Sequence, residues 1–206
     1  MSGQISIDDQ ELFDELRPFQ HWLKGRILNA GCGKRNIEFN TNAVRLDINP
    51  SFASNLDLTA DAHFLPFRDN SFDSILSVAV LEHTKYAWDV VREFNRVLRP
   101  GGYALIAIPF FQPQHGAPQD FVRFTQHGIR ALMEWGKFKV IDVQGVHSFG
   151  YTAEWIAREF LITYPGWRHI FWPIRQFVFP FMRQGKLLSK PVENMRSGYY
   201  AVGEKV

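Results

Sequence analysis

Residues 27–33, ILNAGCG, give the clearest indication of the fold. The first four predict a short buried strand, and this strand leads directly to Gly31 and Gly33. Glycine allows positive φ angles and lets the backbone come close to a ligand, so such a strand end is typical of a nucleotide-binding turn. Ordinary tight turns also contain G-x-G, and the triplet alone leaves both interpretations open.

Short apolar runs alternate with helical patterns over the rest of the chain. An acidic, then amphipathic helix, kinked or divided at Pro18, is expected at the N-terminus. The alternation predicts a doubly wound, mostly parallel α/β sheet, whose ligands bind outside the carboxyl ends of the strands. Strands are predicted at 26–30, 43–48, 56–60, 71–79, 103–108, 137–146 and 198–203, and helices at 88–98 and 125–135.

A dinucleotide-binding turn of the G-x-G-x-x-G type is not expected. Position 36 is Asn, so the glycine that lets a helix pack closely beneath a pyrophosphate is missing. Few residues separate Gly33 from the strand predicted at 43–48, which leaves little room for a long first crossover helix. Both observations argue against NAD or FAD.

Two acidic residues follow predicted strands. Asp47 ends the second strand, where a carboxylate can accept hydrogen bonds from both hydroxyls of a ribose; the alternative is that it caps the Asn49-Pro50 turn. Asp61 and Ala62 can supply an acceptor and a backbone donor to an adenine ring, with Leu65 as an apolar wall. The alternative for Asp61 is again a turn cap.

The stretch from Asp61 to Gly102 resembles the class I S-adenosylmethionine (SAM) dependent methyltransferase family, in its type 11-like form. The matching pieces are D-x-x-x-L-P-F-x-D-x-S-F-D at 61–73, L-E-H at 81–83 and R-V-L-R-P-G-G at 96–102. With Gly31, Gly33 and Asp47, the resemblance covers about residues 26–146. L-N-x-G-C-G and the short first crossover are most similar to a subset from bacterial surface-sugar metabolism.

The resemblance implies a Rossmann-like, seven-stranded sheet whose last strand is antiparallel. Residues 137–146 and 198–203 would form that pair, with an aromatic-rich helical insertion between them. We expect a single domain, 1–206. Its parts would be an N-terminal helix (1–25), the core (26–149), a helical insertion or cap (150–191) and the last strand (192–206).

The resemblance also implies SAM as cofactor and S-adenosylhomocysteine as product. The glycine turn would lie against the methionine part, Asp47 against the ribose, Asp61 and Ala62 against the adenine, and Ser77 and Val78 beside the transferred methyl. Asn29 is a departure, because the family often has an acidic residue there. The predicted cofactor-binding residues are Asn29, Ala30, Gly31, Cys32, Gly33, Asp47, Ile48, Asp61, Ala62, Leu65, Ser77 and Val78.

Four residues are candidates for the chemistry on the acceptor. His115 is a candidate general base on the loop that follows the fifth strand, and His83 is either catalytic or held by a local structural hydrogen bond. Arg123 could bind a carboxylate or phosphate of the acceptor, or it could pair with Asp120 and brace the loop. No His/Cys cluster in the sequence has the spacing of a metal site, so no metal is predicted.

Composition limits the partners. The chain is 46% hydrophobic and 21% charged, with a formal net charge of +2, which argues against nucleic-acid binding by bulk electrostatics. Cys32 is the single cysteine, so a disulfide within one chain is excluded and the cytoplasm is the simplest compartment. No apolar run reaches the roughly 18 residues of a membrane span.

The insertion at 150–190 interleaves aromatic residues with lysine and arginine. It is predicted as a cap over the site, with a peripheral membrane contact or a homodimer surface as alternatives. The predicted function is methyl transfer from SAM to a small-molecule acceptor, such as a sugar or lipid-linked sugar. A methyltransferase-like scaffold without activity is the first alternative, and a nicotinamide oxidoreductase is the second.

Overall fold

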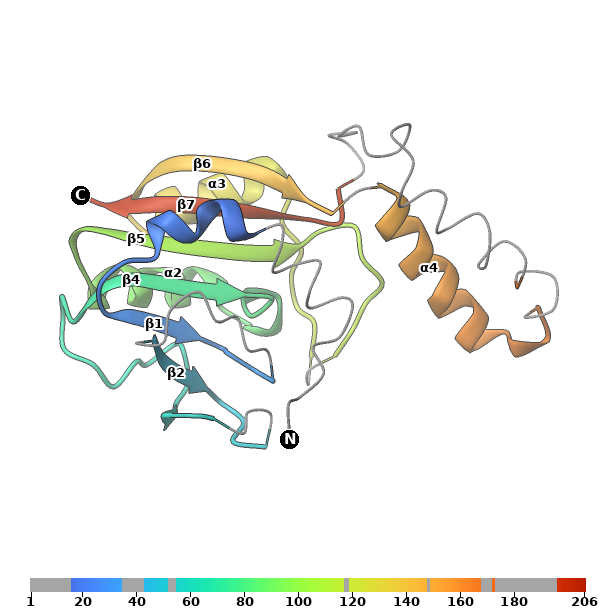
Figure 1. Ribbon diagram of the computed structural model, residues 1–206, viewed down its shortest axis with the longest axis horizontal. Helices are drawn as coiled ribbons and strands as arrows, with labels where there is room; N and C mark the ends of the chain where they lie inside the picture. The colour runs from blue at the N-terminus through green and yellow to red at the C-terminus, as the bar shows by residue number, and fades with distance from the viewer. Residues whose placement is uncertain are drawn as a thin grey trace.

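The computed structural model describes residues 16–34, 43–51, 55–116, 119–147, 149–167, 172 and 196–206. Seven strands form one sheet in the order β3-β2-β1-β4-β5-β7-β6 (Figure 1). They are β1 (Ile27–Ala30), β2 (Ala43–Asp47), β3 (Leu58–Thr59), β4 (Phe72–Val78), β5 (Leu98–Pro109), β6 (Phe138–Val146) and β7 (Gly198–Lys205).

Strand directions confirm the predicted topology. β1 pairs in parallel with β2 and β4, β2 with β3, and β4 with β5. β7 inserts between β5 and β6 and is antiparallel to both, as the family resemblance implied. The carboxyl ends of β1, β2, β4 and β5 therefore share one edge of the sheet.

β5 begins five residues before the predicted strand. Leu98 pairs with Phe72, and the register of the β4–β5 ladder shifts before Ser74 pairs with Tyr103. The irregular stretch contains Gly101 at φ +76, a conformation that glycine adopts without strain. The Pro-Gly-Gly segment, which was expected to separate helix from strand, is thus a bulged part of the strand itself.

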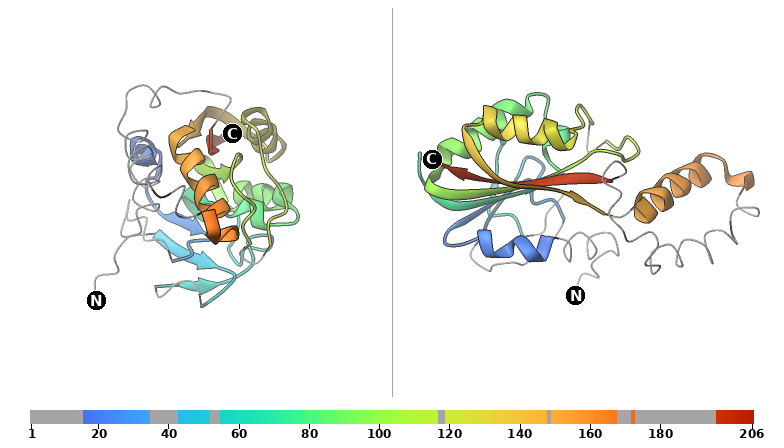
Figure 2. Two further views of the ribbon diagram at one scale, coloured as in Figure 1. Left: turned by 90° about the vertical axis from the view of Figure 1, so that its right-hand side faces the viewer. Right: turned by 90° about the horizontal axis from the view of Figure 1, so that it is seen from above.

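Helices cover both faces of the sheet, as Figure 2 shows. On one face, α2 (Ala87–Val97) and α3 (Gln126–Trp135) pack over the inward side chains of β1, β4 and β5. On the other face lies η1 (Arg17–Trp22), a 3-10 helix with Pro18 in its first turn, where the missing N–H costs nothing. The part of the predicted N-terminal helix at residues 1–15 lies outside the described residues.

Local sequence explains the bounds of the helices. Val90, Val91, Phe94 and Val97 form the fully buried face of α2. The hydroxyl of Thr125 accepts a hydrogen bond from the backbone N–H of Gly128, which confirms the predicted N-cap of α3.

A fourth helix, α4 (Phe149–Thr163), extends from the end of β6 beyond the sheet, followed by the short η3 (Pro165–Trp167) (Figure 1). These elements confirm a helical start to the insertion, while residues 168–171 and 173–191 of it lie outside the described part. Within that part, no helix has the length and apolar character needed to span a membrane.

Candidate functional site

The glycine turn after β1 is fixed by the neighbouring strand. The backbone N–H groups of Gly31 and Cys32 both donate to the carbonyl of Leu46, at 2.7 and 3.0 Å. Gly31 and Gly33 have φ angles of +74° and +53°. The turn thus needs two left-handed residues, which explains glycine at both positions.

The two glycines differ in their surroundings. A Cβ atom at Gly31 would lie 2.3 Å from Cγ2 of Val80, so this turn packs tightly against the chain after β4. Among the described residues, a Cβ atom at Gly33 would meet nothing within 4 Å. This part of the chain therefore leaves the backbone of Gly33 accessible to a ligand at the edge of the sheet.

Asp47 ends β2 and connects two loops. Its side chain is nearly buried, and its two carboxylate oxygens accept hydrogen bonds from the backbone N–H groups of Gly33 and Asn49, both at 2.9 Å. The hydrogen bond from Asn49 confirms that Asp47 caps the turn at Asn49-Pro50. Each carboxylate oxygen has a further lone pair, so the ribose interpretation is compatible with this geometry.

The loop at 61–65 lies beside this turn, because the N–H of Ala60 donates to the carbonyl of Asp47. Oδ1 of Asp61 accepts hydrogen bonds from the backbone N–H and the ring Nδ1 of His63. Partial burial acts to raise the pKa of Asp61, but the hydrogen bonds and charge of His63 outweigh it and lower that pKa. Ala62 and Leu65 are buried, as an apolar wall requires.

The remaining predicted cofactor residues border the same edge. Asn29 and Ala30 are buried in β1, Cys32 is a buried free thiol whose pKa is raised mainly by burial, and Ile48 is exposed. Ser77 and Val78 end β4, and the Ser77 hydroxyl is buried without a hydrogen-bond partner in the described part of the chain. All twelve predicted residues thus lie on or next to the carboxyl ends of β1, β2, β3 and β4.

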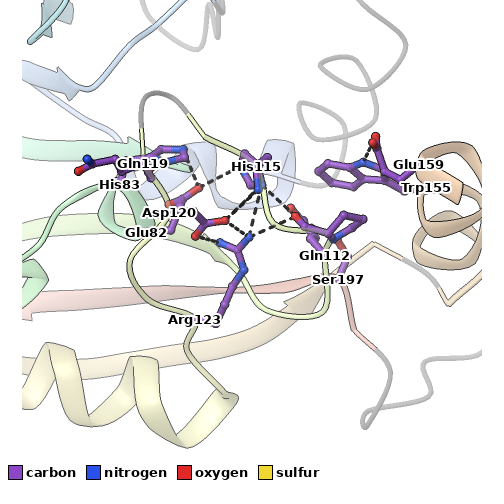
Figure 3. A network of polar contacts seen from close by, with 11 residues as sticks. Glu82, His83, Gln112, His115, Gln119, Asp120, Arg123, Trp155, Glu159 and Ser197 are labelled. Carbon is purple, nitrogen blue, oxygen red and sulfur yellow. Dashed lines mark hydrogen bonds and ion pairs between the residues drawn. The ribbon is translucent and has the colours of Figure 1, made fainter. Parts of the chain in front are cut away.

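A second group of polar side chains gathers beyond β4 and β5 (Figure 3). Glu82 and His83 belong to η2 (Leu81–His83), the short 3-10 helix after β4, and His115 comes from the loop after β5. The backbone N–H of Phe121 donates to the carbonyl of Glu82 at 2.7 Å, which joins this loop to η2. The four predicted acceptor-side residues are therefore brought together.

Asp120 and Arg123 pair with each other and brace the loop. Nη1 of Arg123 donates to Oδ1 of Asp120 at 2.6 Å, and its Nη2 donates to Oδ2. Asp120 Oδ2 also accepts from the backbone N–H of His115 at 3.0 Å, and Arg123 reaches the Pro113 carbonyl at 3.3 Å. Of the two interpretations left open for Arg123, the structure shows the pairing with Asp120.

The two histidines face one another at a ring-centroid distance of 5.2 Å. His83 places Nδ1 2.6 Å from the Gln119 carbonyl, the structural hydrogen bond that was one of its two interpretations. Burial lowers the pKa of His115, nearby Arg123 and His83 add to the effect, and the Pro113 carbonyl and Asp120 oppose it. His115 is thus a half-buried imidazole that stays neutral near pH 7.

Several known proteins are similar to this chain in sequence or in fold. A family model described as a methyltransferase domain matches residues 28–106. The chain is 33% identical over 139 residues to the ubiquinone/menaquinone biosynthesis C-methyltransferase UbiE of Shewanella oneidensis, a match of 66% of this chain and 52% of that protein. The solved structure of a SAM-dependent methyltransferase of Thermotoga maritima has a TM-score of 0.62 at 15% identity, covering 96% of this chain and 91% of that one.

Residues 28–106 thus match a methyltransferase domain family, and the fold is the one seen in SAM-dependent methyltransferases. Another relative, an uncharacterised protein of Methanocaldococcus jannaschii, is 30% identical over 116 residues, which are 50% of this chain and 51% of that protein. The chain thus spans about half the length of the curated relatives it matches. The structure named as the [4+2]-cyclase SpnF also superposes, with a TM-score of 0.61 at 18% identity over 96% of this chain and 80% of that one, so the fold alone does not fix the reaction.

SAM, the methyl donor of this family, fits the residues at the sheet edge. Gly33 offers open space beside its backbone, Asp47 presents a nearly buried carboxylate, and the Ser77 hydroxyl is buried with its hydrogen-bonding capacity unused among the described residues. A carboxylate at this strand end can accept hydrogen bonds from the ribose hydroxyls of SAM. The residues at this edge of the sheet therefore fit SAM.

The role of Arg96 was not predicted from the sequence, although Arg96 begins the R-V-L-R-P-G-G motif. Its guanidinium donates to the carbonyls of Leu65 and Phe67 and to the carboxylates of Glu93 and Asp69, at 2.6–3.0 Å. The hydrogen bond to Glu93 is the main reason that the pKa of Arg96 is raised. Arg96 thus joins the Arg-Val-Leu-Arg motif to the Leu-Pro-Phe motif and holds the loop that contains Leu65 and Phe67.

Replacing Arg96 by lysine is expected to loosen this loop. Lysine keeps the charge but cannot form the same fork of hydrogen bonds. Because the Arg96 side chain is 32% exposed, we expect a loss of only ~1–2 kcal/mol of stability and about a tenfold weaker SAM affinity. Thermal melts and calorimetric SAM titrations measure both.

Arg99→Lys is the matched control. Arg99 belongs to the same motif and pairs with Asp73, but its side chain is 51% exposed and lies away from the loop that contains Leu65 and Phe67. Arg99→Lys should change neither the free energy of unfolding nor the free energy of SAM binding by more than ~1 kcal/mol. Equal effects of the two variants would refute this role of Arg96.

Proposed function

We propose that this protein transfers a methyl group from SAM to a small-molecule acceptor. One observation carries the proposal: the glycine turn at 31–33 and a half-buried cluster of polar side chains adjoin the same edge of the sheet. The first lies after β1 and β2, and the second after β4 and β5. A donor and an acceptor bound at these two places would meet beside Ser77 and Val78.

In this proposal each group of residues has one task. The turn at 31–33, Asp47 and the loop at 61–65 hold and orient SAM, whose sulfonium supplies an electrophilic methyl group. Positioning is the main contribution of the protein to such a displacement. At the acceptor end, the neutral His115 receives a hydrogen bond or a proton from the acceptor, and the Asp120–Arg123 pair holds its loop in place.

Calorimetric titration with SAM, with NADH as the control ligand, tests the cofactor half of the proposal. We expect saturable binding of SAM and none of NADH. A well-folded sample that binds neither would favour the alternative of an inactive scaffold protein. Binding of NADH alone would favour the oxidoreductase alternative.

The acceptor is proposed to be a sugar or lipid-linked sugar. The half-buried cluster of hydrogen-bonding side chains suits a hydroxyl-rich molecule, and the L-N-x-G-C-G resemblance supports the same class. Quinone precursors are the second class to screen, because several relatives are named for ubiquinone and menaquinone biosynthesis. Transfer of a radiolabelled methyl group to one class and not the other decides between them.

We further propose that 150–191 caps the acceptor end of a single domain. The ring of Trp155, on α4, lies 5.9 Å from the ring of His115, which brings this helix to the cluster (Figure 3). Trp155→Ala should raise KM for the acceptor more than Kd for SAM. Equal changes in both would contradict the cap.

The outer surface of the same segment is the candidate for membrane contact or a homodimer, and the cytoplasm, at the membrane surface, is the proposed location. Among its described residues, the exposed large apolar side chains are Ile156, Phe160, Ile162, Tyr164, Trp167 and Trp172. Flotation with anionic liposomes that is lost in an Ile162→Ser/Tyr164→Ser variant would support membrane contact. A dimer in sedimentation analysis, without flotation, would support the homodimer.

A further inference from the structure

Glu82, His83 and His115 bring three potential metal-ligand atoms together. Nε2 of His83 lies 3.6 Å, and Nε2 of His115 lies 3.8 Å, from Oε1 of Glu82. All three ligand atoms are within 4.8 Å of one another. Atoms that share a tetrahedral metal ion at bond lengths of about 2.0–2.1 Å lie about 3.4 Å apart, so small side-chain shifts would bring these three around one ion.

The rings of both histidines are oriented as in metal sites. Nδ1 of His83 lies 2.6 Å from the carbonyl of Gln119, and Nδ1 of His115 lies 3.3 Å from the carbonyl of Pro113 (Figure 3). A carbonyl can only accept a hydrogen bond, so Nδ1 of His83 is assigned the proton and its Nε2 is left as a lone-pair donor. Nδ1 of His115 also lies 3.4 Å from Nη2 of Arg123, which can only donate, so Nε2 of His115 is the lone-pair donor in the tautomer that bonds to Pro113. A metal-bound histidine commonly donates its other ring N–H to such a carbonyl, which fixes its tautomer.

Charge and burial favour a cation at the same point. The side chain of Glu82 is fully buried, and those of His83 and His115 are 15% and 33% exposed. The neighbouring Asp120 and Arg123 neutralise each other. Two imidazole nitrogens and one buried carboxylate oxygen therefore converge at a point where a cation can bind.

We propose that Glu82, His83 and His115 form a binding site for one divalent transition-metal ion. Two imidazoles and one carboxylate suit Zn²⁺ and related ions, whereas Mg²⁺ and Ca²⁺ prefer oxygen ligands throughout. Three protein ligands leave a coordination position open on the side of the partly exposed His115. The proposed metal site does not depend on SAM. The spacing of Glu82 and His115 along the chain does not predict it.

This step rests on the proposed methyltransferase function, in which the ion would activate the acceptor. Its open position would bind an acceptor hydroxyl and lower the pKa of that hydroxyl, so that the acceptor releases its proton more readily. In the metal-bound form Nε2 of His115 is a ligand, and the acceptor proton passes to solvent or another base. The acceptor class implied is a compound with a hydroxyl group that can coordinate the metal.

Metal titration of the full chain, freed of metals by a chelator, tests the site without SAM or acceptor. We expect one equivalent of Zn²⁺ in competition with a chromophoric chelator, and a Co²⁺ absorption spectrum typical of nitrogen and oxygen ligands. Glu82→Gln should weaken Zn²⁺ binding by at least about 100-fold, since loss of a group that merely orients a ligand already costs about 10–100-fold. His115→Gln, at a more exposed position, should do the same and serves if Glu82→Gln does not fold.

The control is His127→Gln, which removes an exposed histidine of α3 that is not one of the three proposed ligands. It should leave the stoichiometry and the Co²⁺ spectrum unchanged. Absence of saturable binding, or binding that both cluster variants retain, would overturn the proposal. Because SAM binding is measured separately on the metal-free protein, failure of this site and failure of the methyltransferase proposal give different results.

Discussion

Replacing Gly31 by alanine is expected to lower the melting temperature strongly and to reduce SAM binding. The left-handed φ of +74° would cost alanine about 1–2 kcal/mol. The added Cβ, 2.3 Å from Cγ2 of Val80, would add overpacking of about 1–3 kcal/mol. For a chain of this length the sum corresponds to a drop of roughly 5–15 °C, measurable by calorimetry or circular dichroism.

Gly33→Ala is the matched control for this variant. Gly33 also has a positive φ, but its Cβ would meet no atom of the described residues within 4 Å. It should lose stability only through backbone strain, about 1–2 kcal/mol, while its methyl group enters the space assigned to SAM. Gly33→Ala should therefore lower SAM affinity more than its small loss of stability would suggest.

A double-mutant cycle with Val80→Ala isolates the packing contribution. Removing both γ-carbons of Val80 takes away the two closest contacts to the new Cβ. The cost of Gly31→Ala should then fall by at least ~1 kcal/mol in the Val80→Ala background. If the cost of Gly31→Ala is the same in both backgrounds, Val80 does not confine the turn.

The sheet could be predicted from the sequence because its strands are buried and short. β1, β4 and the centre of β5 are nearly continuous apolar runs, as expected where helices cover both faces. Periodicity could not show that Leu98 already pairs with Phe72, because Pro100, Gly101 and Gly102 have the composition of a turn. A bulge uses the same residues as a turn, and only tertiary pairing distinguishes them.

The positions of the proposed cofactor residues could be predicted because each lies at the end of a strand or in the loop that follows it. The acceptor side was only partly predictable. His115 and Asp120 follow a strand at some distance, and their positions depend on the Phe121–Glu82 and Gln119–His83 contacts between two loops. Such contacts leave no periodic pattern, so the meeting of Glu82 with two histidines was not foreseen. Adjacent Glu and His within the L-E-H motif were the one available indication.

The membership of the family and the identity of the acceptor are separate questions. The family model ends at residue 106, before the loop that carries His115, Asp120 and Arg123. These three acceptor-side candidates thus lie outside the matched segment, while His83 and the residues proposed for SAM lie within it. Mutations at the cofactor end therefore test family behaviour, and mutations in the loop test what is particular to this chain.

Asp47→Asn is expected to have the largest effect on SAM affinity. The carboxylate accepts hydrogen bonds from Gly33 and Asn49, and it is the group assigned to the ribose. The amide nitrogen of asparagine would face one of these donors, and the negative charge would be lost. Hydrogen bonds to charged groups contribute about 1.5–3 kcal/mol each, so the Kd for SAM should rise about 30-fold or more in calorimetric titrations.

Asp57→Asn separates cofactor binding from general loss of stability. Asp57 also accepts a hydrogen bond from β2, from the backbone N–H of Arg45 at 2.8 Å, but it lies before β3 and away from the glycine turn. Both variants lose a carboxylate bound to a backbone N–H, so both should melt at a lower temperature. Only Asp47→Asn should weaken SAM binding by more than about twofold, because only Asp47 connects the strand end to Gly33. If the two variants bind SAM equally well, Asp47 has a structural role at the turn and the ribose of SAM is bound by other residues.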